Sequence, residues 1–219
     1  AYHSQQKTAV AQQKGIFAEE ILPVEVKGSK KTTLTISQDE HPRAETTLDN
    51  LSALKTPFRK EGGSVTAGNA SGVNDGAACV LLGNQQFAEQ YGLRPKAKVI
   101  GTASAGVEAK YMGIGPVPAV QKVLKQTGLR LEQMDVIELN EAFAAQSLAV
   151  IRELGLQDDD ARINPNGGAI ALGHPLGMSG TRLVITAMHE LKRRNGKYAL
   201  CTMCVGVGQG VALILENMD

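Results

Sequence analysis

Three short segments of this sequence place chemically capable side chains beside turn-forming glycines. They are residues 139–143 (Leu-Asn-Glu-Ala-Phe), residues 164–180, which carry five glycines, and residues 201–210, which open with Cys-Thr-Met-Cys. Each lies at the end of a run typical of a β-strand. Because α/β sheets bind ligands beyond the carboxyl ends of their strands, we expect these segments to lie where ligands bind.

The polar residue of interest in the first segment is Asn140, at an expected strand-to-helix junction. Asparagine at such a junction is a favoured helix N-cap. Its amide can also hold a water molecule or an oxyanion. The sequence leaves both roles open.

The second segment contains one ionisable side chain, His174, which lies just before an expected helix. Helix N-terminal amides favour negative charge, and the glycines let the backbone pass close to a ligand. From this segment alone, a structural histidine and a catalytic histidine are both reasonable.

The third segment has the Cys-x-x-Cys spacing, at Cys201 and Cys204, which is found in zinc and redox sites. The sequence offers no second cysteine pair and no matching histidine spacing, so the support for such a site is weak. In a regular strand the two side chains point to opposite faces. We expect Cys201 in the core and Cys204 at the glycine turn, although a buried inert thiol is possible for both.

Apolar periodicity after Lys96 predicts the order βαβαβαββ, a sheet covered by helices. The strands are expected near Val99–Ile100, at Val136–Leu139, from Ile163, and as a hairpin at Tyr198–Cys204 and Val211–Leu215. The helices are expected after Pro116, over Ala142–Leu154 with most sides buried, and along the apolar stripe Val184, Ala187, Met188 and Leu191.

The chain before Lys96 is less regular. A helix is expected up to Gly15, short strands at Ile21–Val26 and Thr32–Ile36, and a helical turn over Asp49–Leu54. The apolar run Ala77–Leu82 fits a helix or a strand. Small residues dominate 62–72, which indicates close approach of the backbone to another group.

The bulk composition is that of an ordinary globular protein. The chain has 219 residues, 42% of them hydrophobic, and a net charge of +1, so nothing suggests a nucleic-acid or membrane partner. Three cysteines, Cys79, Cys201 and Cys204, favour a reducing compartment, and we expect the cytoplasm. The first helix begins with the chain and has no obvious cap, so we expect that residues before Ala1 are missing.

Taken together, these motifs resemble the thiolases (acetyl-CoA C-acyltransferases), and specifically their C-terminal portion. The resemblance rests on the three segments above, on Val-Thr-Ala-Gly-Asn-Ala-Ser-Gly-Val-Asn-Asp-Gly-Ala-Ala at 65–78, and on Gly-Ile-Gly-Pro-Val-Pro-Ala at 113–119. It implies a thiolase-like layered α/β fold and a homo-oligomer, either a dimer or a tetramer. Residues 1–63 would be part of a loop domain, 64–93 the closing segment of a missing N-terminal half, and 94–219 the C-terminal domain.

The resemblance also implies an activity and a role for each motif residue. Thiolases interconvert a 3-oxoacyl-CoA plus CoA with acetyl-CoA plus a shortened acyl-CoA, without a permanently bound cofactor or a metal. Cys204 would be the acid/base at the α-carbon, which as a base needs a lowered thiol pKa. His174 would activate a nucleophilic cysteine and donate to an oxyanion hole, which a water held by Asn140 completes. The amide of Gly206 would serve a second hole.

Coenzyme A, as a substrate, would contact a further group of residues by the same resemblance. These are Ser71 and Ala67 along the pantetheine arm, Phe58, Met112, Ala142 and Phe143 in the apolar lining of its tunnel, and Arg43 near the nucleotide. Core packing is an equally good role for the apolar four, as is solvent exposure for Arg43.

The sequence departs from the family in two ways. The segment that carries the family's nucleophilic cysteine is not in this chain, so we expect a fragment that is inactive without its missing half. The glycine turn reads Gly-Val-Gly-Gln-Gly at 206–210, where the family often has Gly-Gly-Gly-Met-Gly. The overall sequence looks most like the 3-oxoadipyl-CoA thiolases of aromatic degradation.

Two rival hypotheses for the function are a non-catalytic CoA- or acyl-CoA-binding module and a ketoacyl-synthase-like condensing enzyme. Ketoacyl synthases usually lack a second catalytic cysteine.

Overall fold

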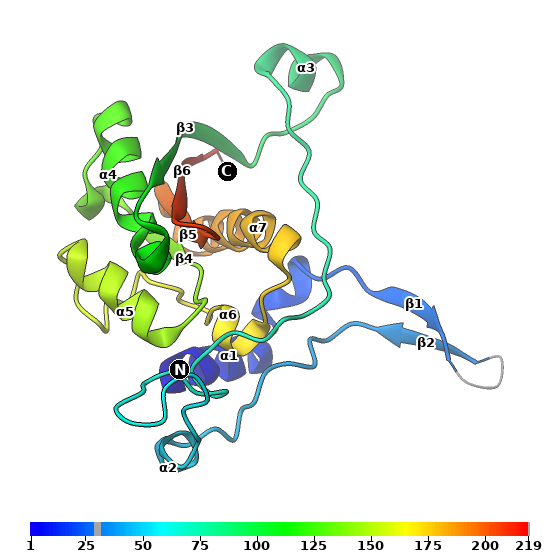
Figure 1. The fold of residues 1–219 in the computed structure, drawn as a ribbon. Helices are drawn as coiled ribbons and strands as arrows, with labels where there is room; N and C mark the ends of the chain where they lie inside the picture. Colours follow the sequence, from blue (N-terminus) through cyan, green and yellow to red (C-terminus); the bar gives the residue numbers. More distant parts are fainter. Residues whose placement is uncertain (29–31, 219) are drawn as a thin grey trace.

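A four-stranded sheet forms the centre of the computed structural model, which describes residues 1–28 and 32–218 (Figure 1). Its strands are β3 (Ala97–Gly106), β4 (Val136–Leu139), β5 (Tyr198–Val205) and β6 (Gln209–Asn217), in the spatial order β3-β6-β5-β4. β4 and β5 are parallel, whereas β6 is antiparallel to both of its neighbours. Residues 29–31 and 219 of the expected domains lie outside the described residues.

Helices cover both faces of this sheet (Figure 1). One face packs against α4 (Pro116–Thr127) and α5 (Ala144–Glu153), and the other against α7 (Leu176–Arg194). The remaining helices are α1 (Tyr2–Gln13), α2 (Leu48–Ser52), α3 (Gln85–Gln90), α6 (Ala169–Leu172), and the 3-10 helices η1 (Ile16–Glu19), η3 (Ala109–Ile114) and η4 (Leu131–Gln133). The predicted layered α/β fold is confirmed.

Strand alternation divides the apolar side chains between two cores. Leu139 of β4 joins the core under α4 and α5, where Val120 is fully buried. Val136 of β4 and Cys201 of β5 join the other core, against Leu191 of α7. Burying each large aliphatic side chain contributes about 1.5–3 kcal/mol, so both helix layers are held firmly to the sheet.

The strand expected from Ile163 does not form. Ile163 makes one parallel bridge to Ile137, and Asn164 then has a φ of 42°, which ends the extended backbone. The Asn164 side chain replaces the missing pairing. Its Oδ1 accepts from Leu139 N at 2.8 Å, and its Nδ2 donates to Leu139 O at 2.8 Å. A side-chain amide therefore completes the edge of β4 where we expected a third strand.

Helix α5 differs from the expectation for Ala142–Leu154 in its start and in its burial. It begins at Ala144, and it buries one side only, with Ser147, Val150 and Ile151. Ala145 is exposed. Alanine permits close packing but does not require it, so the expected burial on most sides was wrong.

The N-terminal region largely follows the predictions. α1 ends shortly before Gly15, whose φ of 66° is the left-handed conformation that glycine favours. The hairpin of β1 (Val24–Lys27) and β2 (Thr33–Ile36) extends away from the sheet (Figure 1). The run 77–82 is neither helix nor strand; its Val80 and Leu82 side chains line an apolar groove instead. Within 1–28 and 32–218, no helix is both long and apolar enough to cross a bilayer.

Candidate active site

Asn140 stands at the carboxyl end of β4 and is fully buried. Its backbone N–H donates to Thr202 O at 3.0 Å on the parallel neighbour β5. The N-cap of α5 is Phe143, so the alternative role of Asn140 as a helix cap is wrong. The sheet holds the main chain of Asn140, and its side-chain amide remains available for chemistry.

The next residue, Glu141, fixes the turn after β4. Its carboxylate accepts hydrogen bonds from Ser4 Oγ at 2.6 Å, Asn164 Nδ2 at 3.1 Å and Ile170 N at 3.1 Å. These donors lie in α1, in the segment that completes the edge of β4, and in α6. Hydrogen bonds to an ionised carboxylate are stronger than neutral ones, so the backbone beyond Asn140 has little freedom.

His174 lies directly before α7, as predicted, and is buried. Its backbone N–H approaches Gly72 O at 3.1 Å and Asn74 Oδ1 at 3.2 Å. The preceding Gly173 has a φ of 93°, and a Cβ there would collide with the Asn74 amide. A glycine is therefore required at 173 for the chain to bring His174 against the 72–74 segment.

The imidazole of His174 is held at both nitrogens. Nδ1 lies 2.5 Å from Ser179 Oγ, whose hydroxyl donates to Pro175 O at 3.0 Å. Ser179 therefore accepts from Nδ1–H, which leaves the lone pair of the neutral ring on Nε2. Asn140 Nδ2 donates to that lone pair at 3.3 Å. Burial, and then the charge of Arg182, lower the pKa of His174, so the ring is neutral near pH 7.

The other side-chain atom of Asn140, Oδ1, is buried and has no hydrogen-bond partner in the part of the chain that the structure describes. An unpaired buried acceptor costs about 1–3 kcal/mol. A water molecule or a ligand donor placed there would remove that cost. The Asn140–His174 pair thus combines an acceptor for a bound water with a neutral ring nitrogen that can take a proton.

Cys204 lies near the carboxyl end of β5, the strand beside Asn140, and is 5% exposed. Burial raises the pKa of its thiol, so Cys204 is protonated at neutral pH and can give a proton. The lowered pKa that a base would need is not produced by the described residues. Cys201, on the opposite face of β5, donates to Leu183 O at 3.5 Å, and burial raises its pKa strongly. The predicted core role of Cys201 is confirmed.

The glycine turn after Cys204 is a tight hairpin. Val207 and Gly208 have φ of 65° and 85°, which is typical of a type I′ turn. A Cβ at Gly208 would collide with Val107 O, and Val107 N–H donates to Gly208 O at 2.7 Å. Gly206 is exposed, and no described atom beyond its chain neighbours lies within 4 Å of a Cβ built there. A ligand can therefore approach the Gly206 backbone.

The small-residue run passes beside Ala142 and Phe143, which follow Glu141. Ser71 N–H donates to Ala142 O at 3.0 Å, and Ala70 forms an antiparallel bridge with Phe143. Three of the residues expected to contact coenzyme A, Ser71, Ala142 and Phe143, are therefore brought together.

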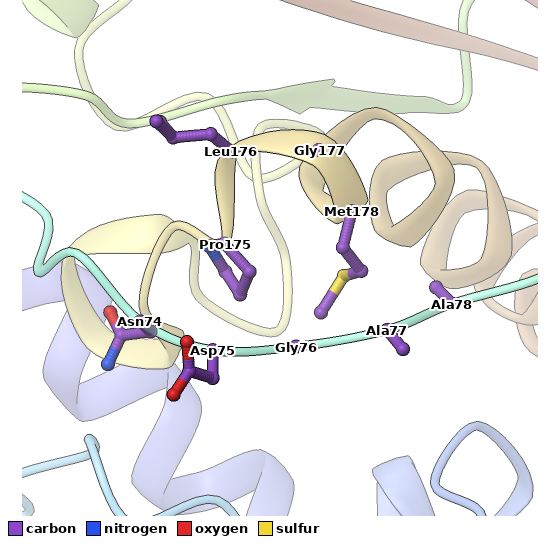
Figure 2. Close-up of a pocket in the computed structure, with 9 residues that line it drawn as sticks. All are labelled: Asn74, Asp75, Gly76, Ala77, Ala78, Pro175, Leu176, Gly177 and Met178. Atoms are coloured by element: carbon purple, nitrogen blue, oxygen red, sulfur yellow. The ribbon is translucent and has the colours of Figure 1, made fainter.

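Beyond this run, residues 74–78 cross the first turn of α7, as Figure 2 shows. Gly76 lies against Pro175 and Met178, and a Cβ built at Gly76 would stand 2.6 Å from Pro175 Cγ and 2.8 Å from Met178 Cε. The close backbone approach predicted for 62–72 is confirmed within that stretch, at Ser71 against Ala142 and at Gly72, where a Cβ would collide with the His41 ring.

The other residues expected to contact coenzyme A differ in how far they are buried. Met112 is half-buried in η3, and Ala67 is exposed. Phe58 is 82% exposed, so the alternative of core packing is wrong for it. Arg43 is exposed, and its backbone N–H donates to Gln5 Oε1 at 2.8 Å.

Sequence reasoning missed Ser179, Asn74 and Glu141 as supports of the site. Ser179 follows His174 by five residues in a helix, a spacing that places a hydroxyl near the preceding loop. Asn74 and Glu141 gave no local signal, because their partners are distant in sequence.

Among the described residues, no cluster of three or more His, Cys, Asp or Glu side chains could hold a metal ion.

Two family profiles match this chain one after the other. The profile described as "Thiolase, N-terminal domain" matches residues 1–86, and the profile described as "Thiolase, C-terminal domain" matches residues 93–217. The chain belongs to the thiolase family.

Individual relatives agree with this assignment. The chain is 62% identical to the 3-oxoadipyl-CoA/3-oxo-5,6-dehydrosuberyl-CoA thiolase of Escherichia coli K12 over 100% of its own length and 54% of that protein's. The Bacillus anthracis acetyl-CoA acetyltransferase structure superimposes with a TM-score of 0.94 at 46% identity, covering 98% of this chain and 54% of that one. Human mitochondrial 3-ketoacyl-CoA thiolase in complex with CoA gives 0.88 at 46% identity, covering 99% and 53%. The chain thus spans about half the length of the curated relatives it matches.

Proposed function

We propose that the whole protein cleaves a 3-oxoacyl-CoA with CoA, giving acetyl-CoA and a shortened acyl-CoA. The observation that carries this proposal is the hydrogen-bonded Asn140–His174 pair, with its unpartnered buried oxygen, at the carboxyl end of β4 next to the strand that carries Cys204. Thiolase chemistry needs these elements, namely a proton acceptor, a held water and a second thiol.

The reaction begins at a nucleophilic cysteine, which we assign to the part of the protein outside this chain. Neutral His174 takes its thiol proton at Nε2, and the thiolate attacks the C3 carbonyl carbon of the 3-oxoacyl-CoA. The charged ring then carries N–H on both nitrogens, and Ser179 still accepts from Nδ1. The protonated Nε2 can no longer accept from Asn140 Nδ2, so that hydrogen bond breaks. Nε2–H then donates, together with a water held by Asn140 Oδ1, to the thioester oxygen on which negative charge develops.

Cleavage of the C2–C3 bond leaves its electron pair on C2, where the Cys204 thiol gives its proton and acetyl-CoA departs. A raised thiol pKa suits this step, because the proton must be present beforehand. The Cys204 thiolate then takes the proton of a CoA thiol. The CoA thiolate attacks the acyl-cysteine, and the Gly206 amide stabilises the tetrahedral oxyanion. When this intermediate collapses, the shortened acyl-CoA leaves, and the departing cysteine thiolate takes back the proton that His174 holds on Nε2.

Coenzyme A is the substrate that we place along the small-residue run. Ser71, Ala142 and Phe143 support this placement, because the main chain at 70–71 pairs with Ala142 and Phe143, which lie two and three residues after Asn140. A narrow wall of small residues fits a long, thin pantetheine arm. We assign Ala67, Met112 and Phe58 to the walls of the same path, and Arg43 to the nucleotide end.

We further propose 3-oxoadipyl-CoA as the substrate, in the degradation of aromatic compounds. Its support is the likeness to the Escherichia coli enzyme of that name at 62% identity. The identity to the 3-ketoacyl-CoA thiolase structure is lower, at 46%, so we favour the dicarboxylic substrate over a fatty acyl chain.

Two exposed apolar surfaces support proposed partners. A groove of about 800 Å³ lies over the α7-side face of β3 and β6, lined by residues such as Val99, Val184 and Leu213, and we assign it to the rest of the protein. The β1–β2 hairpin carries two apolar cross-strand pairs whose side chains are all exposed, Val24 with Ile36 and Val26 with Leu34. Their exposure supports a homo-oligomer.

The three free cysteines support a cytoplasmic location.

The test compares two cysteine variants of the whole protein in a thiolysis assay with 3-oxoadipyl-CoA and CoA. Cys204→Ala should lower kcat about 10²- to 10⁴-fold, because it removes the proton donor. Cys201→Ala is the matched control, since it removes a buried thiol from the same strand and should stay within a few-fold of wild type. Equal activity of both variants, or no thiolysis by the wild-type protein, would overturn the proposal.

A further inference from the structure

A buried ion pair that the reaction above does not use joins β4 to α7. Arg182 Nη1 donates to Glu138 Oε2 at 2.9 Å, and the two side chains are 15% and 0% exposed. Taking charges out of water is costly, and pairing offsets that cost only where the geometry is very good. A buried pair in this position therefore calls for a reason.

The hydrogen bonds of the pair are incomplete. Glu138 Oε1 and Arg182 Nη2 are both buried, and neither has a partner anywhere in 1–28 or 32–218. A bidentate arrangement would have satisfied both atoms. Because apolar residues of similar size often give equal or greater stability than a buried ion pair, stability alone is a poor explanation for this one.

The position of the pair offers a better explanation. Glu138 stands two residues before Asn140 on β4, and Arg182 stands one helical turn after Ser179 on α7. Ser179 accepts from His174 Nδ1, and Asn140 donates to His174 Nε2 at 3.3 Å. Any shift of α7 along β4 changes the second contact, and the ion pair is a direct side-chain connection between these two elements.

We propose that Arg182 and Glu138 are positioning residues for the site: their ion pair fixes the end of β4 that carries Asn140 against the turn of α7 that holds His174 through Ser179. This inference deepens the proposed thiolysis and rests on it for its kinetic consequences. Its structural consequence, the geometry and ionisation of His174, is independent of turnover.

The charge of Arg182 also influences the ionisation of His174 and Glu138. After burial, the Arg182 charge is the next cause that lowers the pKa of His174, so losing Arg182 should raise that pKa. Burial raises the pKa of Glu138 to about 7; Arg182 opposes this rise, whereas Glu20 and Glu141 add to it. The Arg182 charge also acts on Asp39 and on Cys201 of β5.

The experiment uses the whole protein with Arg182→Met, Glu138→Leu and the double variant. Glu138→Gln keeps an acceptor oxygen for Arg182 and serves as the conservative variant. Arg193→Met is the matched control, because it removes an arginine that pairs with Glu190 farther along the same helix. For each protein we would measure kcat and KM for thiolysis, the thermal midpoint, and the ¹⁵N shifts of the His174 ring across pH.

Each single variant should lower kcat about 10- to 100-fold with KM within about twofold, as expected for a misplaced catalytic group. Glu138→Gln should recover most of the loss, and Arg193→Met should resemble wild type. The double variant should regain the thermal midpoint, since no unpaired charge remains, but not kcat. His174 should titrate at higher pH in Arg182→Met.

A double variant with wild-type kcat would overturn the proposal, because the pair would then only fill space. If the wild-type protein shows no thiolysis, the proposed function fails but the ring measurement still decides this inference. An unchanged His174 titration and tautomer in Arg182→Met would overturn it, and a changed one would support it.

Discussion

The hydroxyl of Ser179 sets the tautomer of His174, so its removal is a sharp test of the site. Ser179 is 1% exposed, and its oxygen lies 2.5 Å from Nδ1. Ser179→Ala leaves a buried N–H without this acceptor and lets the ring bind its proton at the other nitrogen. The lone pair would then no longer lie on Nε2, the atom to which the proposed reaction delivers the nucleophile's proton.

The magnitude follows from the lost hydrogen bond. Leaving a buried donor unsatisfied costs about 1–3 kcal/mol. At about 1.36 kcal/mol per tenfold change in rate, this corresponds to a fall in kcat of about 5- to 150-fold. The upper part of the range is expected, because the ring is positively charged in the step that it assists and charged donors bind more strongly.

Steady-state thiolysis by the whole protein is the assay, with circular dichroism to confirm folding. Ser147→Ala is the control: Ser147 is buried on α5, and its hydroxyl oxygen has no partner among the described residues, so its removal should change kcat less than twofold. A Ser179→Ala protein that folds normally and keeps kcat within twofold of wild type would refute the tautomer argument.

Three further predictions concern backbone fit and ionisation. Gly76→Ala should destabilise the protein by about 1–3 kcal/mol in urea unfolding, because its Cβ would stand 2.6 Å from Pro175 Cγ. Gly177→Ala is the control and should be neutral or stabilising, because Gly177 lies in open space on the first turn of α7. Equal effects of the two substitutions would contradict the packing argument. Val207→Gly should raise the thermal midpoint, since a branched residue with a φ of 65° is strained by about 1–2 kcal/mol, and a lower midpoint would show that Val207 makes contacts that outweigh the strain. Glu138 binds a proton more tightly in the folded protein, where its pKa is raised from 4.5 to about 7, so its contribution to stability falls as the pH rises through this window. Glu138→Gln should therefore reduce the difference between the free energies of unfolding in urea at pH 5 and pH 7. An unchanged difference would argue against the raised pKa.

Local patterns were sufficient to predict much of the sheet and its helices. The short, largely apolar segment 136–139 identified β4, which is buried on both faces. The apolar segments 198–204 and 211–215, joined by a glycine-rich turn, identified the β5–β6 hairpin. The apolar stripe of α7 and the position of His174 before that helix also follow from local sequence.

The failures occurred where distant residues decide the local structure. Ile163 looks like the start of a strand, but Asn164 bends the chain and supplies its side-chain amide to Leu139. Nothing near Asn164 in sequence reveals that partner. Glu138 and Arg182 were missed for the same reason: each is an ordinary charged residue until β4 and α7 are packed together.

The parallel pairing of β4 with β5 has a consequence for how the protein is made. The two strands are separated in sequence by α5, α6 and α7, and β5 is in turn held to β3 through β6, the last strand in the part of the chain that the structure describes. Such non-local pairings form slowly, since a long loop must close before any contact is gained. During synthesis Asn140 therefore emerges well before Thr202, the residue that fixes its backbone. The candidate site around Asn140 should be among the last features to form, and an incompletely synthesised chain would lack it.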